Sequence, residues 1–149
     1  MFVEEVETSA KRTVIRTLPR VGSVRAMKPR TLAQLIAGGR VAMGVTLLAS
    51  PARVTRAWVG EAEAERPGAR VLAAGLGGRD LVIGAGVLAS VRSGGHLPWL
   101  VASACSDLFD LVATLRLRAE LPRDGVIVTG LVAGGAAAAG AWLVAQGEL

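Results

Sequence analysis

The sequence contains very few aromatic, cysteine and histidine residues. It has no tyrosine, two phenylalanines and three tryptophans, and its single cysteine and single histidine are Cys105 and His96. One cysteine excludes an intrachain disulfide and any CxxC motif, and a lone histidine without neighbouring ligands does not predict a zinc site. Scarce aromatic residues argue against nucleic-acid binding, which commonly uses base stacking. We therefore expect no metal, no cofactor and no nucleic-acid partner. Cys105 is predicted to be a small buried helix residue, and His96 a loop residue.

Apolar residues with small side chains dominate the composition instead. The chain of 149 residues is 52% hydrophobic and contains 19 glycines, and its mean hydropathy is +0.48. A soluble domain is usually less apolar. Glycine and alanine at this frequency are typical of transmembrane helices, which associate through close backbone contact. The net charge of +5 arises mainly from basic residues that flank apolar runs, where they would meet lipid headgroups.

Four apolar runs cover residues 31–50, 70–91, 97–117 and 125–145. A helix of about 20 residues spans roughly 30 Å, which is the thickness of a hydrocarbon core. All six prolines lie outside these runs or at their edges, as expected for residues that begin or break helices. The sequence therefore predicts an all-α, integral membrane four-helix bundle in residues 31–149. Its partner is the lipid bilayer, and a second copy or another membrane-complex subunit is an open alternative.

Residues 1–30 form a basic N-terminal tail that is either an interfacial amphipathic helix or disordered. Its apolar residues recur at helical spacing, and it has no continuous apolar stretch of the kind that a cleavable signal peptide needs. Four spans place both termini on one side of the cell membrane. Trp99 and Trp142 would lie at one membrane face and Trp58 at the other. Basic residues are nearly balanced between the faces, and the dense basic block of the tail favours cytoplasmic termini.

A soluble dinucleotide-binding domain is the alternative to the membrane fold. The stretch from Arg70 to Gly77 resembles a strand that leads into a glycine-rich loop. The third glycine of G-x-G-x-x-G would fall at Asp80, and no acidic residue follows at the distance needed to hold a ribose. We therefore reject this alternative.

Five ionisable residues lie within the apolar runs: Arg40, Arg79, Asp80, Asp107 and Asp110. Most are near the centres of their runs, where each charge costs about 2.5–3.5 kcal/mol on insertion scales. Opposite charges that face the bundle interior would offset this cost. Ser103, Asp107, Asp110 and Thr114 recur at helical spacing and predict one polar stripe. We expect Arg79 to pair with Asp107 or Asp110 across the second and third helices, and Arg40 to complete the network.

A family resemblance follows from these positions. Arg40-x-x-x-Gly44 with Pro51, then Gly78-Arg79-Asp80 with Gly84, and Asp107 in the third run resemble domain of unknown function 4267, a family of small membrane proteins. The chain resembles DoxX-like four-helix membrane proteins more distantly. The similarity covers residues 31 to about 145. It implies a four-helix membrane fold and no established activity.

The charged residues allow two interpretations. Arg–Asp pairs can fix the register of the helices, or the aspartates can bind a proton, a cation or a polar group, since intramembrane ionisable residues are functional candidates. The predicted function is a non-enzymatic transport or channel-like unit, or an accessory subunit of a membrane complex. The alternative is a membrane-embedded enzyme that acts on a lipid or quinone with an aspartate as acid or base. Gly130-x-x-x-Gly134 and Ala136-x-x-x-Gly140 predict that the fourth helix packs closely against a neighbour.

Overall fold

The structure, a computed structural model, describes residues 27–147. Within this range all regular elements are α-helices, which confirms the predicted all-helical class. The four long helices are α2 (Pro29–Ala49), α5 (Pro67–Ser93), α6 (Leu97–Arg116) and α7 (Arg123–Gln146). Two short helices, α3 (Pro51–Val59) and α4 (Glu61–Ala64), connect α2 to α5. The amphipathic segment predicted in the N-terminal tail lies outside the described residues.

Prolines and glycines set the ends of these helices. Pro29, Pro51 and Pro67 each occupy the first helical position, where the missing N–H group has no intrahelical partner to lose. Gly60 and Gly94, which follow α3 and α5, have φ angles of 91° and 85°. These positive φ angles favour glycine and end each helix.

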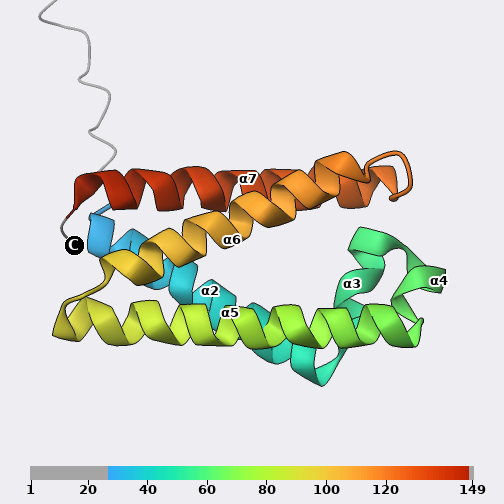
Figure 1. Ribbon diagram of the computed structural model, residues 1–149, viewed down its shortest axis with the longest axis horizontal. Helices are drawn as coiled ribbons and strands as arrows, with labels where there is room; N and C mark the ends of the chain where they lie inside the picture. Colours follow the sequence, from blue (N-terminus) through green and yellow to red (C-terminus); the bar gives the residue numbers. More distant parts are fainter. Residues whose placement is uncertain (1–26, 148–149) are drawn as a thin grey trace, which may run out of the picture.

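The four long helices form two antiparallel pairs. α2 packs along α5, and α6 packs along α7, with α3 and α4 at one end of the bundle (Figure 1). α2 and α5 approach so closely that a Cβ atom at Gly44 would lie 2.6 Å from the carbonyl oxygen of Gly77. A Cβ atom at Gly84 would lie 2.7 Å from the carbonyl oxygen of Ala37. Glycine at these crossings therefore permits the backbone contact that holds the first pair together.

The second pair confirms the predicted close packing of the fourth helix, but among the glycines of the two predicted motifs only Gly140 makes a tight contact. A Cβ atom at Gly140 would lie 2.9 Å from the Cβ atom of Ala104 in α6. Gly134 would make only ordinary contact with Leu111, and Gly130 faces open space. The angle at which α6 crosses α7 decides which small residues lie at the contact between the two helices. The spacing of glycines in the sequence does not specify that angle.

The two ends of the bundle differ in their packing. The end where α2 begins and α7 ends is filled by an apolar cluster, and we call it the packed half. Its buried members are Ala33, Ala37, Val87, Val91, Leu100 and Leu143. At the other end, which we call the open half, the helix pairs separate and α3 lies between them (Figure 1). Gly125 at the start of α7 lets the backbone of Ala57 and Trp58 in α3 approach closely.

The outer surface of the bundle is apolar. All four long helices are long and apolar enough to cross a membrane, and only 17% of the most apolar stretch of α7 is buried. Phe109 and Leu131, for example, are 72% and 74% exposed. Exposed apolar surface on this scale is typical of a surface that contacts a membrane or another protein. It also explains why the predicted burial of Cys105 is wrong. Cys105 is exposed because it lies two positions after Ser103, on roughly the opposite side of the helix from the polar stripe.

Two further predictions concern the ends of the helices. His96 lies between α5 and α6, as the loop prediction required. Residues 70–77 lie inside α5, so the strand that a dinucleotide-binding domain needs is not formed there.

Candidate functional site

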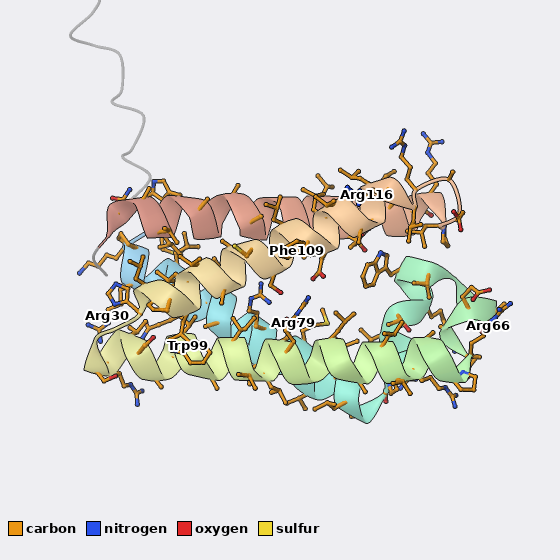
Figure 2. The ribbon with its side chains drawn as sticks, in the orientation of Figure 1. Arg30, Arg66, Arg79, Trp99, Phe109 and Arg116 are labelled. Atoms are coloured by element: carbon orange, nitrogen blue, oxygen red, sulfur yellow. The ribbon has the colours of Figure 1, made fainter. Side chains whose placement is uncertain are left out.

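Five charged side chains from three helices meet near the middle of the bundle. Arg40 lies in α2, Arg79 and Asp80 lie in α5, and Asp107 and Asp110 lie in α6. Each is more than one helical turn from the ends of its helix, and Figure 2 shows Arg79 pointing from α5 toward the opposite helix pair. The structure therefore brings together all five residues that the sequence singled out. We call them the charged network.

Arg40 joins three helices. It is 7% exposed, and every guanidinium nitrogen has a partner. Nε donates to Ser103 Oγ at 2.8 Å, and Nη1 donates to Asp80 Oδ1 at 2.7 Å. Nη2 donates to the Ser103 carbonyl oxygen at 2.8 Å and lies 2.6 Å from Asp107 Oδ1. A buried arginine with this number of partners is stabilised only if all of them remain in place.

Arg79 pairs with Asp110, which is one of the two partners predicted for it. Its Nη1 and Nη2 donate to Asp110 Oδ1 and Oδ2 at 3.0 and 2.7 Å, a two-pronged arrangement. Nε and Nη2 also donate to Asp80 Oδ1 at 3.3 and 3.2 Å. The other predicted partner, Asp107, pairs with Arg40 instead. Asp80 thus accepts from both arginines and links the two ion pairs into one network.

The network contains one more carboxylate than guanidinium groups. Two arginines face three aspartates, so its formal charge is −1 when all five are ionised. Asp107 Oδ2 is a buried oxygen that has no hydrogen-bond partner within residues 27–147, and the whole residue is 9% exposed. Ser106 Oγ is also buried and has no hydrogen-bond partner within these residues. A buried carboxylate oxygen without a partner is unfavourable, so this atom offers an unused acceptor.

A cavity of about 350 Å³ adjoins the network in the open half. Four of the five network residues line it, and Asp124 at the start of α7 adds a further carboxylate. Most of the remaining wall is apolar and comes from α2, α3, α5 and α7: Met43, Leu47, Val54, Ala57, Trp58, Leu76, Val128, Val132 and Ala133. The cavity therefore has charged groups on one part of its wall and hydrocarbon on most of the rest, as small-molecule sites do.

Residues on the outer surface of the bundle also line this cavity. Met43 of α2 is 45% exposed, and Val128 and Val132 of α7 are 60% and 65% exposed. α2 begins beside the end of α7 and then runs away from it toward the open half (Figure 1). The side of the cavity between α2 and α7 is therefore formed by exposed apolar side chains.

Helix α3 closes the end of the cavity and connects to the network. Trp58 Nε1 donates to Thr114 Oγ1 at 3.2 Å, and Thr114 Oγ1 donates to the Asp110 carbonyl oxygen at 2.7 Å. A second cavity of about 240 Å³ lies beyond Trp58, with walls of α3, α5, α6 and the turn after α6. Thr55, Trp58 and Leu76 line both cavities, so α3 forms a partition between them.

Hydropathy along the sequence did not predict α3 or its role at the site. Residues 51–59 carry two arginines and contain too few residues to span a membrane, so hydropathy alone does not distinguish them from a loop. The available signal was helical spacing. Pro51 opens the segment, and Ala52 and Thr55, three residues apart, are its buried positions. Trp58 was predicted only as a membrane-interface residue, because its hydrogen bond joins elements distant in sequence.

Four long apolar helices with a charged interior indicate a multi-pass membrane protein. Among residues 27–147, no three His, Cys, Asp or Glu side chains are grouped so that they could hold a metal ion. In comparisons with known proteins, no family model, no curated protein and no solved structure matches the chain. The resemblance to domain of unknown function 4267 and to DoxX-like proteins therefore stays a prediction.

Proposed function

We propose that this chain is a multi-pass protein of the cell membrane that binds a small, largely apolar solute in the cavity of the open half. In this proposal the charged network forms the polar end of the binding site, and the protein acts as a small transport-like unit. The alternative in which the network only fixes helix register explains Arg40 well, because Arg40 is fully paired within the protein.

The observation that carries the proposal is the position of the cavity beside the network. A network that only fixes the register of the helices is most stable when packed side chains surround it, because buried ion pairs need all their partners in fixed positions. Here Arg79, Asp80, Asp107 and Asp110 instead line a space of about 350 Å³. That volume lies at the lower end of the range for small-molecule sites, about 300–1,000 Å³.

Cavity occupancy can be measured through Trp58. In a Trp99→Phe/Trp142→Phe background, Trp58 is the remaining tryptophan and lies in the cavity wall. We expect alkyl probes that carry a terminal bromine to quench its fluorescence saturably in lipid nanodiscs. Val132→Phe should prevent this by narrowing the cavity. Leu131→Phe is the matched control, because Leu131 is exposed on α7 and does not line the cavity. Linear quenching that both variants leave unchanged would contradict the proposal.

Solute movement is a separate measurement. Proteoliposomes loaded with a probe that binds the cavity should release it faster than empty liposomes, and Val132→Phe should remove the difference. Binding without movement would instead favour an accessory subunit that holds a ligand for a membrane complex.

A membrane-embedded enzyme is the second candidate. The observation that favours it is Asp107 Oδ2, a buried oxygen without a partner on a residue that lines the cavity. A carboxylate in this position has a free site for a proton, as a general acid or base needs. Turnover of lipid or quinone substrates by the purified protein, lost in Asp107→Asn, would establish the enzyme. Binding without turnover would favour the transport-like unit.

The topology is also testable. Both ends of the described chain lie at the same end of the bundle (Figure 1), and we propose that this end faces the cytoplasm. In a Cys105→Ala background, single cysteines introduced at Glu5 and Glu148 should both react with a membrane-impermeant label only after cells are permeabilised. Labelling of the two positions from opposite sides would contradict the four-span topology.

A further inference from the structure

We propose that the cavity of the open half binds a membrane-soluble primary amine, which enters sideways from the lipid between α2 and α7 and places its ammonium group at Asp107. This inference rests on the proposed function, because it names the class of solute that the same cavity takes. It follows from the charges around the cavity, the donors already in use and the apolar entrance.

The charge around the cavity favours a cation. Asp80, Asp107, Asp110 and Asp124 line the cavity, and Arg79 is the only basic residue among its lining residues. Arg40 lies behind this wall and is buried. Even when both arginines are counted, four carboxylates face two guanidinium groups. An ammonium group would reduce this excess of negative charge, whereas a carboxylate or phosphate would increase it.

The hydrogen bonds point to the same class of head group. Four hydrogen bonds direct Nε, Nη1 and Nη2 of Arg79 to Asp110 and Asp80, so an anionic ligand would meet at most one remaining N–H of Nη1 beside two carboxylates. The buried group without a partner is an acceptor, Asp107 Oδ2. A primary ammonium group carries three donors and no acceptor. It can therefore donate a hydrogen bond to Asp107 Oδ2, and the opposite charges of the ammonium and carboxylate groups strengthen this bond.

The entrance indicates that the ligand comes from the membrane. Met43, Val128 and Val132 line the cavity and are also exposed on the outer surface, at a level of the bundle where that surface would meet hydrocarbon. α2 and α7 contact each other near the packed half, where Leu143 and Val144 lie against the cluster that contains Ala33 and Ala37. They diverge toward the open half (Figure 1). An alkyl chain can therefore pass between them without leaving an apolar environment.

Three matched probes test the head group. Bromoundecylamine, bromoundecanol and bromoundecanoate each carry bromine at the end of an eleven-carbon chain and differ in the head group, which is cationic, neutral or anionic. Each is titrated into nanodiscs of zwitterionic lipid that contain the Trp58-only variant. A Trp58→Phe/Trp99→Phe variant retains Trp142, which is exposed on the outer surface and reports simple partition into lipid. We expect the amine to quench Trp58 at about a tenfold or more lower concentration than the alcohol, after correction for Trp142.

Substitutions test the assignment to Asp107. Asp107→Asn keeps the shape of the side chain and removes its charge, and it should abolish the preference for the amine over the alcohol. Glu120→Gln removes a carboxylate that is exposed in the turn after α6, and it should leave the preference unchanged. If Asp107→Asn does not fold, Val132→Phe provides the second test, because it changes no charge and should block the amine, whereas Leu131→Phe should not.

The outcomes separate this inference from the proposed function. Equal quenching of Trp58 by amine and alcohol would overturn the amine inference and leave the cavity as a binding site. Preference for the carboxylate, or an amine preference that survives Asp107→Asn, would also overturn the inference. If no probe quenches Trp58 more than Trp142, the proposed function fails as well. Amine quenching that persists in Val132→Phe would exclude entry between α2 and α7.

Discussion

The packed half and the open half of the bundle are built from the same four long helices but are held together differently. In the packed half, apolar side chains and glycines bring the helices into direct contact. In the open half, α3 separates the two helix pairs, and a cavity occupies the space between them. The charged network lies where the two halves meet. The comparison shows that one end of a bundle can be tightly packed while the other keeps an internal space, with ion pairs at the boundary between them.

The largest expected effect comes from breaking that boundary. Arg40→Leu removes the guanidinium group that pairs with both Asp80 and Asp107. Two buried carboxylates then lose their ion pair with Arg40. We expect a loss of about 3–5 kcal/mol in the free energy of unfolding, measured by denaturant titration in detergent or bicelles. Arg92→Leu is the control, because Arg92 is exposed near the end of α5. An equal loss in both variants would mean that the boundary does not depend on the network.

The next effect comes from separating the helices of the packed half. Gly84→Ala places a Cβ atom within 2.7 Å of the Ala37 carbonyl oxygen, so α2 and α5 must move apart. Overpacking of this kind costs about 1–3 kcal/mol. Gly75→Ala in the same helix meets nothing within 4 Å and should be neutral or slightly stabilising. The same unfolding titration compares the two variants, and a stable Gly84→Ala protein would show that this contact is not required.

A double-mutant cycle sharpens the description of the boundary. Arg79→Leu and Asp110→Leu should be non-additive by about 0.5–3 kcal/mol, because the two side chains share two hydrogen bonds. Both side chains are partly exposed, at 30% and 24%, so we expect a smaller coupling energy than for a fully buried pair. The cycle of Arg79 with Asp107 is the control. A larger coupling energy in the control would contradict the observed pairing.

The smallest effect concerns the helix that closes the open half. Trp58→Phe removes the hydrogen bond to Thr114 Oγ1 and should lower the free energy of unfolding by about 0.5–1.5 kcal/mol. It should also connect the two cavities, since Trp58 lines both. Trp142→Phe is a matched control on the outer surface. A Trp58→Phe protein as stable as the control would show that this hydrogen bond is not needed to hold α3 in place.

Sequence periodicity and hydropathy were sufficient to predict the four long helices and the five residues of the charged network. Four apolar runs with prolines outside them or at their edges predicted the four long helices, because about 20 mostly apolar residues are the length that a membrane-spanning helix needs. The expense of an isolated charge in such a helix predicted that Arg40, Arg79, Asp80, Asp107 and Asp110 would meet. Both inferences depend on properties of single helices and on the solvent around them.

The pairing within the site and the cavity beside it were decided by the tertiary structure. Asp107 and Asp110 lie one helical turn apart, so the sequence could not distinguish which of them meets Arg79. The approach of α2, made possible by Gly44 and Gly84, brings Arg40 to Asp107 and leaves Asp110 to Arg79. The tertiary structure also decides the position of α3. This helix lies between the helix pairs because Gly125 has no side chain to block its backbone and because Trp58 donates a hydrogen bond to Thr114. Crossing angles and distances between helices arise from contacts between distant parts of the chain, and the pattern within any one run does not contain them.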